Sequence, residues 1–271
     1  MAVAENQRLN KEVKELRARI AALESSRWWR LHPRFALLRL LRRLMPARPA
    51  TERRARPVAS RPAPTPVDEL TARFREEVVA RGSFSQDWFT MHIQRWEPFV
   101  RELEGTSARI LELGSFEGLS AAFLLWRLPD AHVTCVDTFA GIPEYAAYGI
   151  AGPELGAAFD RNVALVDGSR VRKLTGETHR VLPDLVDEQA EFDLVYVDAS
   201  HRALDVLVDA ALMWKLLAPN GIAIFDDYDE VSALPNPNEH PAPAIDAFLR
   251  LVAHEAQVLA KEGQLIVRKT R

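Results

Sequence analysis

Three aspartates and one histidine stand where their chemistry can combine. Asp198 ends one apolar segment, the pair Asp226-Asp227 ends the next, and His201 follows Asp198 by three residues. Carboxylate oxygens are hard ligands that suit Mg²⁺, and a histidine with an ordinary pKa of about 6.5 suits proton transfer at neutral pH. The alternative is structural: Asp198 caps a helix, the aspartate pair forms a solvated turn, and His201 faces solvent. If the fold brings the ends of these two segments together, we expect a metal-assisted site there.

A second candidate site lies earlier, in a glycine turn that follows an apolar strand. Gly114 and Gly118 allow the backbone to approach a ligand closely. Their spacing differs from the G-x-G-x-x-G of dinucleotide folds, and Glu112 and Glu117 accompany them. Because carboxylates repel a diphosphate, the turn favours a cationic or zwitterionic ligand. Asp137, which ends the next strand, is placed to accept hydrogen bonds from ribose hydroxyls.

Apolar strands alternate with amphipathic helices from residue 67 onward. The expected strands are 109–113, 132–136, 171–174, 193–197 and 221–225, and the expected helices are 68–81, 87–104, 118–127, 156–166, 179–186, 203–218 and 242–252. A hairpin over 255–260 and 264–269, turned by 261–263, ends the chain. This order predicts an α/β fold with a mostly parallel sheet, helices on both faces and an antiparallel hairpin at one edge. Ligands bind beyond the carboxyl ends of such strands, so both candidate sites belong to the side of the sheet where these strands end.

These motifs resemble class I S-adenosylmethionine-dependent methyltransferases, which have a Rossmann-like seven-stranded sheet. Residues 112–120 resemble their first motif, Asp137 their ribose-binding acid, and 175–178 the segment that borders the adenine. The resemblance covers about residues 84–271, with further landmarks at 87–89, 196–201 and 225–228, and implies S-adenosylmethionine as cofactor. The residues that it assigns to the cofactor are Glu112, Gly114, Ser115, Gly118, Ser120, Asp137, Thr138, Gly176, Glu177, Thr178 and Asp198.

Within that class, the Asp-x-x-His segment and the later acidic pair are similar to metal-dependent O-methyltransferases, including those that act on sugar hydroxyls. The resemblance implies Asp198, Asp226 and Asp227 as metal ligands, and His201 and Asp198 as catalytic residues, with His201 the general base. It implies methylation of a hydroxyl on a sugar or glycan acceptor, with Mg²⁺ lowering the pKa of that hydroxyl. Many methyltransferases of this fold need no metal. The alternative function is a catalytically silent methyltransferase-like scaffold in a (poly)saccharide biosynthetic complex.

The net charge of −3 is a cancellation between two parts of the chain. Residues 1–66 carry 16 Lys and Arg against 5 Asp and Glu, a net charge of +11, whereas residues 67–271 carry −14. Residues 1–25 have the apolar heptad spacing of a coiled coil, 26–45 predict a basic amphipathic helix, and 46–66 form a Pro/Arg-rich linker. We therefore expect an N-terminal arm followed by the methyltransferase domain.

Several functions are possible for the arm, residues 1–66. Its heptads favour self-association or pairing with another protein over a lone solvated helix. The basic helix, with Trp28 and Trp29 beside it, suits an anionic membrane surface, a partner protein or the chain's own domain. Nucleic-acid binding ranks below tethering, because the chain has no recognisable nucleic-acid module. The arm loosely resembles the front of some bacterial surface-polysaccharide glycosyltransferases and methyltransferases, which favours a glycan acceptor.

The composition excludes several classes of protein. A chain of 271 residues that is 48% hydrophobic is neither collagenous nor wholly disordered. Cys135 is its single cysteine, so no internal disulfide forms and nothing in the cysteine content supports secretion. The first residues show no signal-peptide pattern, and the apolar stretch 35–45 is short and interrupted by arginines. We expect a cytoplasmic protein with at most peripheral contact at the inner membrane face.

Overall fold

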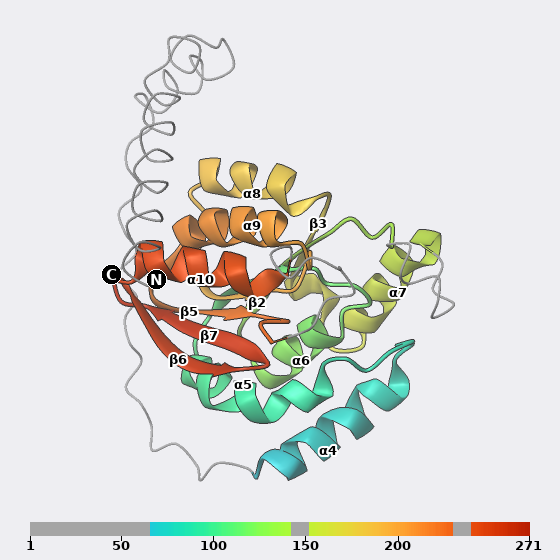
Figure 1. Cartoon of the computed structure of the whole chain (residues 1–271). Coiled ribbons are helices and arrows are strands. Elements are labelled where there is room, and N and C mark those ends of the chain that lie inside the picture. The colour runs from blue at the N-terminus through green and yellow to red at the C-terminus, as the bar shows by residue number, and fades with distance from the viewer. Residues whose placement is uncertain (1–65, 142–151, 230–239) are drawn as a thin grey trace, which may run out of the picture. The chain divides into compact units, whose positions relative to one another are not determined.

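The computed structural model describes residues 66–141, 152–229 and 240–271 (Figure 1). The predicted coiled coil, basic helix and linker lie outside these residues, apart from Pro66. Residues 142–151 and 230–239 also lie outside the described ranges. Among the helices described, none has the length and apolar character needed to cross a membrane.

A seven-stranded sheet in the order β3-β2-β1-β4-β5-β7-β6 forms the centre of the domain. Its parallel strands are β1 (Arg109–Leu113), β2 (His132–Asp137), β3 (Val171–Thr175), β4 (Phe192–Val197) and β5 (Leu217–Phe225). The terminal hairpin of β6 (Ala256–Glu262) and β7 (Gln264–Lys269) pairs antiparallel with β5. The Rossmann-like sheet with its C-terminal hairpin is therefore confirmed. The chain order reverses between β1 and β4, which is where ligands bind in such folds.

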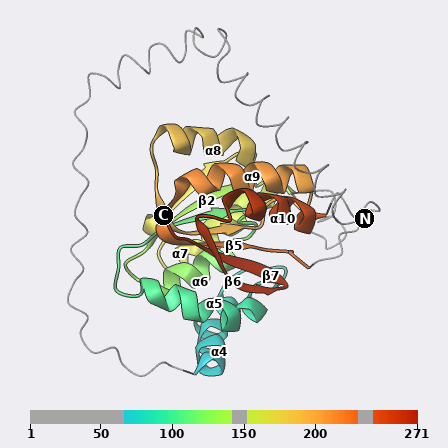
Figure 2. The same ribbon diagram turned by 60° about the vertical axis from the view of Figure 1, so that its left-hand side comes forward.

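Helices cover both faces of this sheet (Figures 1 and 2). On one face lie α4 (Val67–Glu77), α5 (Ile93–Val100), α6 (Leu119–Arg127) and α7 (Gly152–Ala164). On the other lie α8 (Thr178–Asp187), α9 (Ala203–Leu216) and α10 (Pro241–Val252). Short 3₁₀ helices occupy Val79–Arg81, Thr90–His92, Arg101–Leu103 and Gly168–Arg170.

Each face of the sheet has its own apolar core, because side chains alternate along a strand. In β1, Ile110 packs in the core with α4, α5 and α6, whereas Leu111 and Leu113 pack in the core with α8, α9 and α10. Four of the five residues of β1 are buried, as expected for a parallel strand covered on both sides. Glu112 is the one charged side chain among these four buried residues.

The helix predicted over 87–104 is present from Thr90 to Leu103, but only its centre is α-helical. Asp87 accepts hydrogen bonds from the backbone N–H and hydroxyl of Thr90, which starts a 3₁₀ turn, and α5 begins only at Ile93. The last predicted turn is again 3₁₀, over Arg101–Leu103. The hairpin turn also differs, because β6 continues to Glu262 and the reversal centres on Gly263 with φ +64°. The other predicted elements agree apart from a few residues at their ends.

Asp209 on α9 is a carboxyl buried against the start of α8. Its side chain is 1% exposed, and neither of its oxygens has a hydrogen-bond partner among the described residues. Burial raises the pKa of Asp209 from 3.8 to about 6, while nearby Thr178 and His179 oppose the shift. Because the folded chain binds this proton more tightly than the unfolded chain, the stability that Asp209 contributes is lost as pH rises from 3.8 through 6.

We expect Asp209→Asn to be more stable than the parent at pH 8. The gain is up to about 3 kcal/mol in the free energy of unfolding, the linkage equivalent of the raised pKa. The difference should shrink to nothing below pH 4, and urea unfolding at pH 4, 6 and 8 measures it. Asp184→Asn, which changes an exposed carboxyl on α8, is the matched control and should follow the parent at each pH. A difference between Asp209→Asn and the parent that does not vary with pH would contradict the expectation.

Candidate functional site

The carboxyl ends of four neighbouring strands meet at one edge of the sheet. Gly114 follows β1 and donates its N–H to Val136 O of β2 at 2.8 Å. Asp198 follows β4 and donates its N–H to Leu113 O at 2.8 Å, and Asp226 follows β5 and donates to Val197 O at 3.0 Å. These backbone hydrogen bonds continue the pairing of neighbouring strands beyond their last residues. The glycine turn and both acidic segments therefore lie side by side.

The glycine turn is shaped by two left-handed residues, Gly114 with φ +84° and Gly118 with φ +80°. A Cβ at Gly114 would lie 1.9 Å from Asp198 O, so the backbones of the two strand ends pack directly against each other. Gly118 is the N-cap of α6, and a Cβ there would lie 2.9 Å from the Phe159 ring. Both predicted glycines are thus required by close packing as well as by their backbone angles.

Asp137 holds the glycine turn against the end of β2. Its Oδ2 accepts hydrogen bonds from the N–H groups of Ser115 at 2.9 Å and Phe116 at 2.8 Å. Its Oδ1 accepts from the N–H of Phe139 at 2.7 Å. Phe116 and Phe139 both have positive φ, at 46° and 50°. Asp137, which is predicted to bind a ribose, therefore also fixes the two loops on either side of it.

Glu112 and Ser120 lie beneath the turn instead of lining its surface. The Glu112 carboxyl is fully buried, accepts a hydrogen bond from Ser120 Oγ, and lies 3.5 Å from Cys135 Sγ. Burial raises the pKa of Glu112, against the opposing effect of its hydrogen bonds. These two predicted residues support the turn from below, where β1, β2 and α6 converge.

The third predicted cofactor segment follows β3. Gly176 donates its N–H to Asp137 O at 2.9 Å, which attaches this segment to the end of β2. Thr178 begins α8, and the Glu177 carboxylate pairs with Arg180 at 2.9 Å. Thr138 is exposed beside them. The structure therefore gathers the predicted residues of the turn, of β2 and of β3 at one place.

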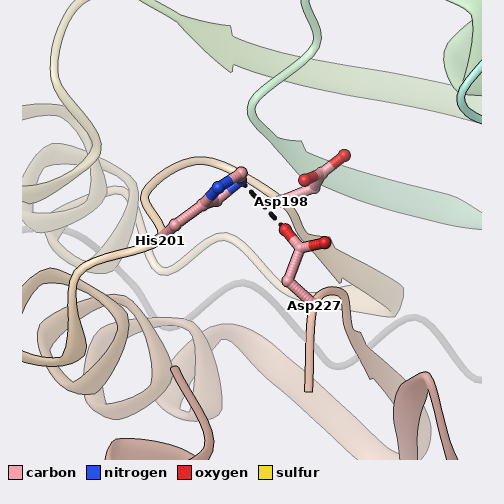
Figure 3. Close-up of side chains that lie close together, drawn as sticks. All are labelled: Asp198, His201 and Asp227. Carbon is pink, nitrogen blue, oxygen red and sulfur yellow. Dashed lines mark ion pairs between the residues drawn. The ribbon is translucent and has the colours of Figure 1, made fainter. Parts of the chain in front are cut away.

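Asp198, His201 and Asp227 form a compact cluster at the same edge (Figure 3). One ligand atom from each lies within 4.8 Å of the others. His201 Nε2 is 2.9 Å from Asp227 Oδ2, and the two side chains point toward each other. The His201 side chain is 48% exposed and that of Asp227 21%, so the cluster is open to solvent. Asp227 has φ +54°, a left-handed angle that is unusual for aspartate and turns its carboxyl toward His201.

The electrostatics of the cluster suit a cation. Burial, and then the charges of Asp226 and Asp227, raise the pKa of Asp198 well above its ordinary value, against a hydrogen bond from Tyr196. Carboxylates held this close repel one another, and a divalent ion between them relieves that repulsion. Asp198 and Asp227 offer carboxylate oxygens, which suit Mg²⁺ or Mn²⁺, whereas the His201 imidazole is a nitrogen donor that Mg²⁺ prefers less. The residues present therefore fit such an ion.

The carboxyl of Asp226 forms its hydrogen bonds outside the cluster. Its Oδ1 accepts hydrogen bonds from Gln264 Nε2 and from the N–H of Asp227, each at 3.0 Å. Its Oδ2 is bonded to the Tyr196 hydroxyl. Within the described ranges, the group of potential ligands contains Asp198, His201 and Asp227 but not Asp226. The predicted triplet of aspartates is thus brought together at the strand ends, with only two of its carboxyls in the cluster.

Sequence reasoning missed several residues of this site. Tyr196 had a usable signal, because it lies two residues before Asp198 and so shares its side of β4. Gln264 lies in the terminal hairpin and had none. His92, in the 3₁₀ turn before α5, is a third: burial lowers its pKa, and the nearby charges of Asp226 and Asp227 oppose that lowering.

Residues 111–228 match a family model described as "Methyltransferase domain". The chain carries a methyltransferase domain. The matched residues run from β1 to just beyond β5, so this domain includes the glycine turn, Asp137 and the Asp198–His201–Asp227 cluster.

The methyltransferase domain has relatives among curated proteins and solved structures. O-methyltransferase hkm8 of Aspergillus hancockii is 29% identical over 174 residues, or 62% of this chain and 60% of the relative. MycE methyltransferase from the mycinamycin biosynthetic pathway, solved with Mg, SAH and mycinamycin VI, is 15% identical with a TM-score of 0.52, covering 76% of this chain and 53% of that one. A putative O-methyltransferase from Klebsiella pneumoniae is 20% identical with a TM-score of 0.53, covering 76% and 92%. These structures share the fold.

We expect Gly114→Ala to destabilise the methyltransferase domain far more than Gly105→Ala. Both glycines are left-handed, but nothing lies within 4 Å of a Cβ placed at Gly105. Gly105→Ala should cost about 1 kcal/mol through backbone strain alone. Gly114→Ala must also displace the Asp198 carbonyl, so its melting temperature should fall several degrees further. Thermal unfolding of both variants measures this, and equal losses would contradict a close contact at Gly114.

Proposed function

We propose that this chain is an S-adenosylmethionine-dependent O-methyltransferase. The observation that carries the proposal is the direct packing of the glycine turn, at Gly114, against Asp198 of the His201–Asp227 cluster in a methyltransferase domain. The name of the Aspergillus relative and the SAH bound in the MycE structure support it. When bound, S-adenosylmethionine supplies an electrophilic methyl group on a sulfonium.

The residues around the turn suit that cofactor. Gly114 and Gly118 would shape the turn beside which the cofactor binds, and Asp137, fixed by three N–H groups, would face its ribose. The 176–178 segment, attached to β2 beside Asp137, would border the adenine. A sulfonium cation suits an edge crowded with carboxylates better than a diphosphate does.

His201 would act as the general base. An Nε2–H that donates to Asp227 Oδ2 makes Nδ1 the nitrogen that takes the proton of the acceptor hydroxyl. Asp227 orients the imidazole and stabilises its charge after proton transfer. Asp198 and the second oxygen of Asp227 would hold Mg²⁺, which would lower the pKa of the acceptor hydroxyl. Holding hydroxyl, base and methyl donor together supplies much of the rate acceleration.

The proposed acceptor is a hydroxyl on a sugar or glycan. Its support is the sequence resemblance to metal-dependent sugar O-methyltransferases and the resemblance of the arm to surface-polysaccharide enzymes. The arm, which lies outside the described residues, would serve assembly and docking, at an anionic membrane surface or on a partner protein, in a cytoplasmic enzyme. Failure to bind S-adenosylmethionine in calorimetry would favour a silent scaffold module instead.

We expect His201→Gln to lower kcat by about 100-fold, which is the usual size of a general-base contribution. The affinity for S-adenosylmethionine should stay within twofold of wild type, because His201 lies in the cluster and not in the turn. Methyl transfer to sugar nucleotides, lipid-linked glycans and phenolics provides the assay. His254→Gln, an exposed histidine after α10, is the control. Wild-type turnover in His201→Gln would refute the role of base.

We expect Asp227→Asn to abolish stimulation by Mg²⁺ while leaving cofactor affinity largely intact. The amide loses the charge that attracts the cation and that stabilises a protonated His201. Turnover is measured across a Mg²⁺ titration and in excess chelator. Asp130→Asn, in the exposed turn before β2 at the opposite edge of the sheet, should behave as wild type. If the wild-type enzyme keeps full activity in excess chelator, the cation is not part of the mechanism.

A further inference from the structure

A continuous chain of hydrogen bonds runs beneath the cluster and ends on Asp198. Trp96 Nε1 donates to Gln264 Oε1 at 2.9 Å, and Gln264 Nε2 donates to Asp226 Oδ1 at 3.0 Å. Asp226 Oδ2 is bonded to the Tyr196 hydroxyl, which lies 2.9 Å from Asp198 Oδ2. We call these residues the polar chain. It connects α5, β7, β5 and β4, which come from distant parts of the sequence.

The polar chain is buried where an apolar core would otherwise form. Trp96 and Gln264 are 0% exposed and Tyr196 is 2% exposed. Buried polar groups cost free energy unless each is hydrogen-bonded, and here each lies within hydrogen-bond distance of the next. The Trp96 ring also packs edge-to-face on the Tyr196 ring, with centroids 4.6 Å apart, which fixes the direction of the phenol. This arrangement contacts the cluster at the Asp198 carboxylate and at the backbone N–H of Asp227, which donates to Asp226.

The turn of the terminal hairpin also holds the segment around Asp227. On one side of Asp227, Gln264 bonds to Asp226. On the other side, Gly263 and Asp229 are joined by two hydrogen bonds, of 2.8 Å to the Asp229 carboxylate and 3.3 Å between backbones. Asp227, with its left-handed backbone, lies between these two attachments. The hairpin therefore fixes the position of Asp227, and through the polar chain it fixes that of Asp198.

We propose that Gln264, Asp226 and Tyr196 are positioning residues that set the distance and orientation of Asp198 and Asp227 for a divalent cation. Asp226 acts through Tyr196 and is not itself a ligand. This inference rests on the cation part of the proposed function. Mg²⁺ demands near-ideal geometry from its oxygens, and loss of a residue that orients a ligand typically weakens metal affinity about 10- to 100-fold.

The test is binding of Mg²⁺ and Mn²⁺ to the full chain by calorimetry, with no cofactor or acceptor present. Tyr196→Phe removes the hydroxyl between the two aspartates. Gln264→Glu keeps an oxygen for the Trp96 N–H but replaces the donor that faces Asp226 with an oxygen. We expect the Kd of each variant to rise about tenfold. The matched control is Trp214→Phe, which removes an indole hydrogen bond to Glu255 in the other core and should lower the melting temperature without changing the Kd.

A double variant separates positioning from ligation. Asp226→Asn combined with Gln264→Glu exchanges donor and acceptor, so the bond between the two positions forms again. If Asp226 positions Tyr196, the double variant regains affinity relative to Gln264→Glu alone. If Asp226 is a ligand, affinity falls further, because a neutral amide replaces a carboxylate. That fall would overturn the assignment.

The remaining outcomes are also decisive. Wild-type Kd values in Tyr196→Phe and Gln264→Glu, with the fold intact by near-ultraviolet circular dichroism, would overturn the inference and leave the proposed function standing. A parallel loss of affinity in Trp214→Phe would show a general effect of destabilisation and would also overturn it. A wild-type chain that binds neither cation would overturn both the inference and the cation part of the proposal, while methyl transfer in chelator would still report the proposed activity.

Discussion

The contact between Gly114 and the backbone of Asp198 is the constraint on which the site depends. It occurs because β1 and β4 are adjacent, with the Asp198 N–H bonded to Leu113 O, so the two strand ends leave no room for a side chain. A turn suited to a methyl donor and a cluster suited to activating a hydroxyl are thereby held next to each other. In a transfer between two bound molecules, such placement contributes a large part of the rate.

The same adjacency has an electrostatic cost, which the surrounding residues reduce. Asp198, Asp226 and Asp227 repel one another, and burial adds to the free energy needed to charge Asp198. Hydrogen bonds from Tyr196 and Gln264 satisfy two of the carboxyls, and His201 pairs with the third. These three carboxyls lie together in a segment, residues 67–271, whose net charge is −14, so this end of the strands favours cations over phosphates. This bias is consistent with a sulfonium and a divalent ion.

Periodicity in the sequence predicted the strands, the glycine turn and the meeting of Asp198 with Asp227, because the carboxyl ends of parallel strands must share one edge. It did not predict which neighbour each carboxyl faces. Asp226 and Asp227 are adjacent in sequence, yet a left-handed backbone angle at Asp227 sends one to His201 and the other to Tyr196. Gln264 is 38 residues from Asp226 and lies in no motif, so only the folded chain shows their bond.

The antiparallel direction of β7 explains how a hairpin at the C-terminus can reach the site. Leu265 pairs with Phe225, so the first residues of β7 lie beside the last residues of β5. Had β7 run parallel to β5, its start would lie at the opposite edge of the sheet, and Gln264 would be far from Asp226. The reversed strand therefore places a buried amide behind the aspartates and the hairpin turn beside Asp229. The topology at the end of the chain is in this way part of the construction of the site, and not only a cover for the edge of the sheet.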